Sequence, residues 1–92
     1  MNKSELIDAI ASGSGVTKAD ASKVLETFMT TVTDTLKSGL QVVIPGFGSF
    51  LTANRSARAG INPKTGETIQ IQASRVAKFK AGKRLKEAVQ EA

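Results

Sequence analysis

The sequence predicts an α+β fold in which helices occupy both ends of the chain and antiparallel strands lie between them. Apolar residues recur every three or four positions up to Gly39, and the same period returns after Gly82. Between these two glycines, β-branched residues flank a Pro-Gly turn, which is typical of strands. The 92 residues are one domain's worth of chain. A lone domain of that size buries only about 60–70% of its unfolded surface, so pairing with a second copy would add stability.

The first predicted helix is defined by its two ends. Asn2 and Glu5 have the spacing of a capping box, in which each side chain accepts a hydrogen bond from the other residue's main chain. Leu6 and Ile10 fall on one helical face. Ser and Gly residues at positions 12–15 then end the helix, so we expect a short turn before the next element.

A second helix is predicted over roughly residues 18–38. Thr17 and Asp20 mark its start, since Asp20 lies where the helix dipole favours a negative charge. Apolar residues form one stripe along it, and Gly39 is a good stop signal. Two antiparallel helices joined by a short turn are the simplest arrangement for residues 1–39.

The pattern then changes to strands. The first contains Leu40, Val42, Val43 and Ile44, Pro45-Gly46 form a turn, and residues 47–51 begin a second strand. The phenylalanines of the strand region are expected to fill a core rather than to bind a ligand. After Gly82, a single apolar face predicts a final short helix.

Residues 53–76 predict a long, thin β-hairpin, which we call the arm. Its turn is the run Asn-Pro-Lys-Thr-Gly at 62–66. If Ile61 opposes Glu67, one face is lightly apolar, the other is polar, and neither has side chains large enough to be buried in a core. A strand from 53 to 62 would reach about 30 Å at ~3.3 Å per residue. We therefore expect the arm to project into solvent, with a tip that is mobile until a partner orders it.

The whole chain has a net charge of +5, and its positive charge is concentrated in the second half. Residues 1–52 carry four Lys/Arg and five Asp/Glu, whereas residues 53–92 carry nine and three. This asymmetry indicates a polyanionic partner, and a solvated basic surface is the alternative. A continuous basic track would neutralise phosphates and release their counterions. The track comprises Arg55, Arg58, Lys64, Arg75, Lys78, Lys80, Lys83, Arg84 and Lys86.

Pro63, at the tip of the arm, has two interpretations. Turn statistics favour a plain turn proline. Alternatively, its rigid ring is an apolar wedge that slips between base pairs and kinks a duplex, an unstacking cost that the extra contacts of bent DNA offset. The neighbouring Asn62 would then hydrogen-bond to base edges in the minor groove.

The residue inventory argues against an enzyme. There is no Cys for a disulfide or a thiolate metal site, and no His to act as a general base or metal ligand. No apolar run approaches the ~20 residues that a membrane span needs, and the first residues are unlike a signal peptide. We expect a non-enzymatic, soluble, intracellular protein without a metal or cofactor.

Four sequence runs together resemble the bacterial histone-like HU and integration host factor family, and HU most closely. They are MNKSELIDAIA, GFGSF, GINPKTGETI and FKAGKRLKEAV, and the resemblance extends along essentially the whole chain. It implies an intertwined homodimer with a helical base, residues 1–39, and two arms that embrace double-stranded DNA and bend it, with one intercalated Pro63 per arm. It also implies a cytoplasmic, nucleoid-associated protein that compacts DNA through the minor groove with little sequence preference. A heterodimer with a paralogue, and RNA binding as a side activity, stay open.

The resemblance also assigns the DNA contacts, in which arm residues meet the groove and body lysines meet phosphates. In one departure, Ile61 stands where the family usually has Arg, which removes one cation per arm. The predicted DNA-binding residues are Lys3, Arg55, Arg58, Asn62, Pro63, Lys64, Arg75, Lys80, Lys83 and Lys86.

Two alternatives accompany this interpretation. The first is a site-specific DNA bender of the integration host factor type, although the ending EAVQEA is more similar to HU. The second is an adaptor whose arm binds a partner protein by strand addition. The low acid content of residues 53–86 argues against the adaptor.

Overall fold

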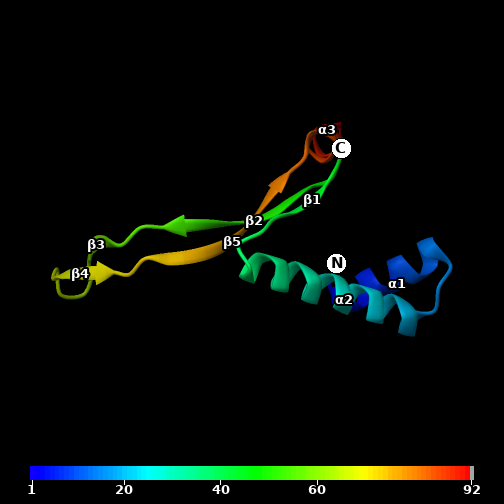
Figure 1. Ribbon diagram of the computed structural model, residues 1–92, viewed down its shortest axis with the longest axis horizontal. Helices are drawn as coiled ribbons and strands as arrows, with labels where there is room; N and C mark the ends of the chain where they lie inside the picture. Colours follow the sequence, from blue (N-terminus) through cyan, green and yellow to red (C-terminus); the bar gives the residue numbers. More distant parts are fainter. Residues whose placement is uncertain (92) are drawn as a thin grey trace. The chain divides into compact units, whose positions relative to one another are not determined.

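The computed structural model describes residues 1–91, and the side chains of all of these except Arg58 and Ile71. The chain forms two compact units, Met1–Thr35 and Leu36–Ala92. The predicted α+β class is confirmed, because helices and antiparallel strands follow one another in the predicted order (Figure 1). The elements are α1 (Lys3–Ser14), α2 (Lys18–Lys37), β1 (Val42–Ile44), β2 (Gly48–Arg55), β3 (Arg58–Ile61), β4 (Thr68–Ile71), β5 (Ser74–Ala81) and α3 (Lys83–Glu91).

Helix α1 begins at the predicted capping box. The Glu5 amide donates to Asn2 Oδ1 at 2.8 Å, and the Asn2 amide donates to Glu5 Oε1 at 3.4 Å. The helix ends at Gly15, whose φ of 75° lies in the left-handed region and whose amide donates to the Ala11 carbonyl oxygen at 3.0 Å. Glycine adopts this conformation without the steric cost that a side chain imposes. The local sequence therefore determines both ends of α1.

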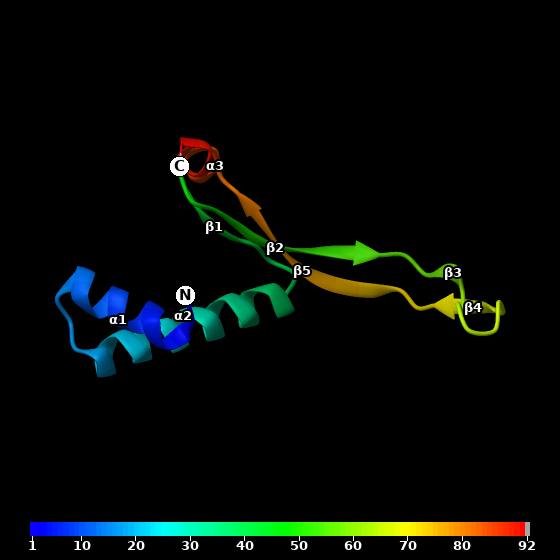
Figure 2. The same ribbon diagram turned by 180° about the vertical axis from the view of Figure 1, so that it is seen from behind.

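Helix α2 also has the predicted start and stop. Thr17 Oγ1 accepts a hydrogen bond from the Asp20 amide at 3.1 Å, and Gly39 follows the helix with a φ of 79°. α1 and α2 lie side by side (Figures 1 and 2). Ala11 and Ala21 are 8% and 0% exposed, and among the side chains that the structure describes they are the only buried apolar ones. A single chain thus encloses almost no core.

In the second unit, β1, β2 and β5 form an antiparallel sheet in the order β1–β2–β5. The predicted Pro45-Gly46 turn joins β1 to β2, with the Phe47 amide donating to the Ile44 carbonyl oxygen at 3.0 Å. Gly46 has a φ of 82°, as the second central residue of a type II turn requires. This turn sets Ile44 opposite Gly48 and so fixes the register of the two strands.

Three phenylalanines cluster on this sheet. Phe50 pairs with Phe79 across β2 and β5, and Phe47 lies 5.5 Å from Phe79 between ring centroids. Gly48 permits this approach, because a Cβ at that position would lie 2.4 Å from Phe79 Cζ. The rings contact one another as expected of a core. However, Phe47 and Phe79 remain 45% and 42% exposed, so the single chain leaves this core open.

The end of the arm is the β3–β4 hairpin, and its register corrects the predicted one. Ile61 opposes Thr68, not Glu67. The turn is the cause, because the Asn62 amide donates to the Glu67 carbonyl oxygen at 2.8 Å. The Gly66 amide then closes on the Asn62 carbonyl oxygen at 2.7 Å. Asn62 and Glu67 therefore form the closing pair of a four-residue loop, and every pair behind them moves by one residue.

The corrected register mixes apolar and polar residues on the hairpin. Ala59 opposes Gln70, and Gly60 opposes Ile69. The predicted division into a lightly apolar face and a polar face is therefore wrong, since a shift of one residue changes every cross-strand partner. The hairpin still lies beyond the far ends of β2 and β5, and both views show no other element of the second unit beside it (Figures 1 and 2). The arm projects, as predicted.

Candidate nucleic-acid interface

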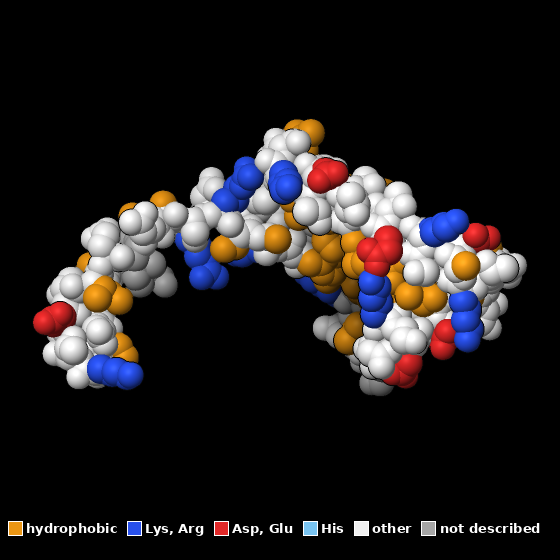
Figure 3. All heavy atoms as spheres, turned by 90° about the horizontal axis from the view of Figure 1, so that it is seen from below, with side chains coloured by type: hydrophobic (Ala, Val, Ile, Leu, Met, Phe, Trp, Pro, Cys, Tyr) orange, Lys and Arg blue, Asp and Glu red, His pale blue; other side chains and the backbone are white. Residues whose placement is uncertain are grey.

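Charge differs sharply between the two units. Met1–Thr35 carries three Lys/Arg and five Asp/Glu, whereas Leu36–Ala92 carries ten Lys/Arg and three Asp/Glu. Figure 3 shows positive and negative side chains interspersed over the helical pair, and mainly positive ones over the sheet and the start of the arm. A polyanion would therefore bind to the second unit through long-range attraction as well as through direct contacts.

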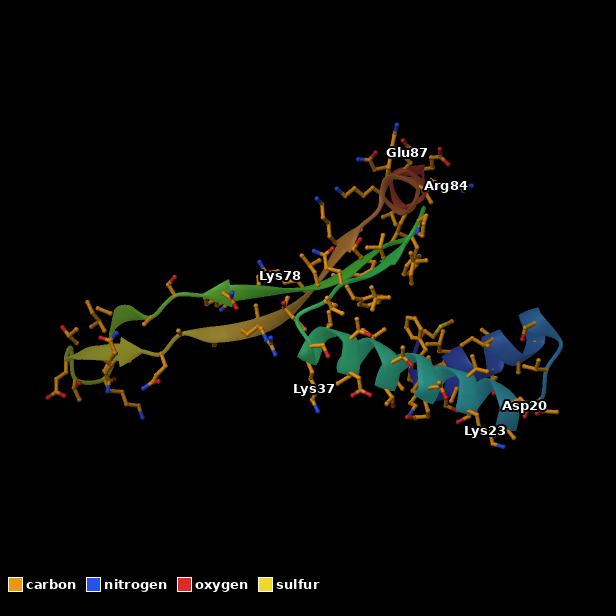
Figure 4. The ribbon with its side chains drawn as sticks, in the orientation of Figure 1. Asp20, Lys23, Lys37, Lys78, Arg84 and Glu87 are labelled. Atoms are coloured by element: carbon orange, nitrogen blue, oxygen red, sulfur yellow. The ribbon has the colours of Figure 1, made fainter. Side chains whose placement is uncertain are left out.

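One face of the body sheet carries a row of cations. Lys78 and Lys80 lie two residues apart on β5, opposite Leu51 and Ser49 of β2, and Arg55 follows on the same side at the end of β2. Side chains alternate between the two faces of a strand, so this row lies on the face opposite Phe50 and Phe79. Arg55, Lys78 and Lys80 are all exposed, and we call them the basic face. Figure 4 shows Lys78 on β5.

The pairing register of β2 and β5 continues into the arm without a shift. Arg55 pairs with Ser74 in the body sheet, and Arg58 pairs with Ile71 three residues further along each strand. Between these pairs, residues 56–57 and 72–73 leave the ladder. The arm is thus one continuous hairpin with a break in its hydrogen bonding near the root. The predicted contact Arg58 has its backbone in β3, but its side chain lies outside the described part of the structure.

Helix α3 adds three exposed cations. Lys83 lies 3.9 Å from Glu87 one turn along the helix, measured between Nζ and Oε1. Lys86 is exposed, as predicted. Arg84 lies next to the β1–β2 turn, because a Cβ on Gly46 would meet Arg84 Cδ at 3.2 Å (Figure 4). The stem of Arg84 therefore covers the turn while its charged end remains at the surface.

The tip of the arm presents Pro63 and Lys64 to solvent. The Lys64 amide donates to Asn62 Oδ1 at 2.9 Å, which makes an Asx turn. This bond occupies the oxygen of the Asn62 amide and leaves its NH₂ group as the donor for a ligand. Ile61, next to the turn, is 70% exposed, so a second apolar side chain lies near the tip.

Two predicted DNA contacts are already engaged within the protein. Lys3, in α1, forms an ion pair with Glu26 of α2. Arg75, in β5, donates from Nη2 to the carbonyl oxygen of Lys37 at 3.0 Å. The sequence analysis did not predict the Arg75 contact, because Lys37 is 38 positions away. The acceptor is a main-chain oxygen, which every residue has, so the residue types give no signal for it.

The described residues do not suggest other chemistry. Within residues 1–91, no group of three or more His, Cys, Asp or Glu side chains is arranged to hold a metal ion. None of the helices in the same range has the length and apolar character required to cross a membrane. The candidate interface is therefore a surface of exposed cations and an apolar tip.

This fold and this exposed basic surface are those of a DNA-binding protein. The comparison with known proteins leads to the same class. The profile of the family described as Bacterial DNA-binding protein matches residues 1–90, and the chain belongs to this family. It is 53% identical to the DNA-binding protein HU-beta of Serratia marcescens over 89 residues, which cover 97% of this chain and 99% of the relative. It is 51% identical to the DNA-binding protein HU 1 of Bacillus subtilis, covering 97% of each chain. The resemblance to HU is thereby confirmed.

Solved structures agree with the sequence comparison. The HU–DNA cocrystal structure from Anabaena superposes with a TM-score of 0.93 at 46% identity and covers 100% of both chains. HU from Thermotoga maritima superposes with a TM-score of 0.69 at 38% identity, covering 97% of this chain and 98% of that one. The chain therefore has the HU fold, including the β-arm.

Proposed function

We propose that this protein is an architectural DNA-binding protein of the HU type, which binds double-stranded DNA with little sequence preference, bends it and helps to compact the nucleoid. The observation that carries the proposal is the arm, which projects, exposes cations and has no apolar face with which to pack on its own body. A DNA groove supplies the missing surface, and its phosphates attract the cations. The Anabaena relative crystallised with DNA supports this assignment.

The residues at the tip of the arm support two further parts of the proposal, binding in the minor groove and insertion of Pro63 between base pairs. Pro63 is exposed on a turn that two backbone hydrogen bonds close, so its ring lies at the outer end of the arm. Inserting such a ring between base pairs costs a few kcal/mol of unstacking, which the contacts of the bent duplex offset. The NH₂ group of Asn62 is a donor that matches the acceptors lining the minor groove. The protein's preference among DNA sites would then depend on how easily each site bends rather than on its base sequence.

The cations of the arm and those of the body would contact different phosphates of the DNA. Those of the arm line the groove, and those of the body receive the duplex where it bends around the protein. Lys3 would exchange Glu26 for a phosphate on binding. The proposed contacts are Lys3, Arg55, Arg58, Asn62, Pro63, Lys64, Lys80, Lys83 and Lys86.

A homodimer is part of the proposal. Phe28, Phe47 and Phe79 are 40%, 45% and 42% exposed, which is unusual for aromatic residues in a stable monomer. A second copy of the chain would cover these rings and complete the core that the single chain leaves open. In this division, residues 1–39 serve mainly for dimerisation, and residues 53–76 serve for DNA binding.

One titration tests the function. The purified protein is titrated with intact and nicked fluorescent duplexes of several sequences at two salt concentrations, and its mass is measured by sedimentation. We expect a dimer that binds every sequence, prefers the nicked duplex, and weakens steeply with salt. A footprint restricted to one sequence would replace the proposal with a site-specific bender. Failure to bind DNA at low ionic strength would refute it, and capture of a protein in molar salt would favour the adaptor.

A further inference from the structure

Arg75 differs from the cations of the basic face because its guanidinium is bound to the protein itself. Its Nη2 donates to the main-chain carbonyl oxygen of Lys37 at 3.0 Å. Lys37 is the last residue of α2, and both residues belong to the second unit. The contact therefore joins the arm strand β5 to the point where the chain leaves α2.

The end of a helix is a favourable place for this charge. The last carbonyl groups of a helix have no partners within it, and they carry a partial negative charge. The Gly39 amide donates to the Leu36 carbonyl oxygen at 3.0 Å, and the Lys37 carbonyl oxygen accepts from Arg75. A Cβ on Gly39 would lie 4.0 Å from Arg75 Nη1, so the second nitrogen of the guanidinium also lies against the helix end.

The strand register places Arg75 where the arm begins. Arg75 pairs with Asn54, one pair before Arg55 and Ser74 close the β2–β5 ladder. Beyond that pair, residues 72–73 leave the ladder. Alternation along β5 puts Arg75 on the side of Phe79, which is the side opposite the basic face.

We propose that Arg75 is a positioning residue that holds the root of the arm to the end of α2, and that it does not neutralise a phosphate. Its charge is already paired with the helix end, and its side chain leaves the sheet on the face away from Lys78 and Lys80. The tether limits fraying of the last pairs of β2 and β5, so the arm starts from a fixed direction. That Arg75 makes no phosphate contact rests on the DNA-binding function proposed above, whereas the tether to Lys37 does not.

Amide hydrogen exchange of the dimer without DNA tests the tether. In Arg75→Gln, we expect the amides of residues 53–55 and 74–76 to exchange about fivefold faster, because a charge-assisted hydrogen bond is removed. Arg75→Lys keeps a charged donor and should retain most of the protection. Arg55→Gln is the matched control: it removes the same charge one position away on the other face, and should leave exchange unchanged.

The salt dependence of DNA binding tests the remaining half of the proposal. Arg75→Gln should keep the log–log salt slope of the unaltered protein, whereas Arg55→Gln should reduce it by about 0.9 for each phosphate that is no longer neutralised. A slope that falls equally in both variants would overturn the proposal, and so would unchanged exchange in Arg75→Gln. If the unaltered protein did not bind DNA, the proposed function would fail, and the exchange comparison would still decide whether Arg75 tethers the arm.

Discussion

Phe50 and Phe79 face each other across β2 and β5, with ring centroids 4.9 Å apart and ring planes inclined by 52°. This tilted packing is a favourable arrangement for two aromatic rings. The pair belongs to no closed core in the single chain, since Phe79 is 42% exposed. The sheet therefore has aromatic surface that a second copy can bury.

Phe79→Ala should destabilise the folded protein by about 3 kcal/mol, because it removes the central ring of the cluster and leaves a cavity. Urea unfolding followed by circular dichroism measures this. The unfolding midpoint should rise with protein concentration, as it does when folding and association are linked. Lys78→Ala, the neighbouring residue on the other face, is the control and should change stability by under about 0.5 kcal/mol. Equal destabilisation in the two variants would argue against an aromatic core.

Pro63→Ala should reduce DNA bending strongly and weaken affinity less. The alanine has no ring to insert between base pairs, but the cations that supply most of the binding energy remain. Energy transfer between dyes at the ends of a short duplex reports the bend, and fluorescence anisotropy reports the affinity. Thr65→Ser, in the same turn, is a control that keeps both Pro63 and the hydroxyl that accepts a hydrogen bond from the Glu67 amide at 3.3 Å. An unchanged bend in Pro63→Ala would contradict the wedge.

Ile61→Arg should make the salt dependence of DNA binding steeper. It restores one cation at an exposed position of each arm, and a dimer would gain up to about 2 units of log–log slope. Ser12→Arg adds the same charge to α1, in the other unit, and controls for net charge. We expect this control to leave the slope nearly unchanged. Identical slopes for Ile61→Arg and the unaltered protein would mean that residue 61 does not approach a phosphate.

Asn2→Ala should destabilise the protein by about 1 kcal/mol through the removal of the helix cap. The Glu5 amide would lose its acceptor at Oδ1, and the reciprocal bond of the capping box would remain without its partner. Thermal unfolding measures the change. Ser12→Ala, an exposed position inside α1, should be neutral or slightly stabilising, because alanine is the better helix former. A similar decrease in both variants would show that the cap does not stabilise α1.

Local signals explain why much of the fold could be predicted. The capping box at Asn2, the stop at Gly39 and the turn at Pro45-Gly46 each depend on residues within a few positions of one another. The projecting arm could be predicted too, because its composition lacks the large apolar side chains of a core. The register of the arm could not, since two hydrogen bonds in the turn decide it and the residue pattern allowed either pairing.

The amino-acid sequence by itself determined which segments are helical, where the chain turns, and that a basic, poorly packed hairpin presents Pro63 at its tip. Only the tertiary structure decided that Ile61 opposes Thr68 and that Arg75 is bound to Lys37. The physical reason is the separation along the chain of the groups that interact. Caps, turns and charge are properties of neighbouring residues, whereas cross-strand partners and a side chain's acceptor depend on where distant parts of the backbone meet.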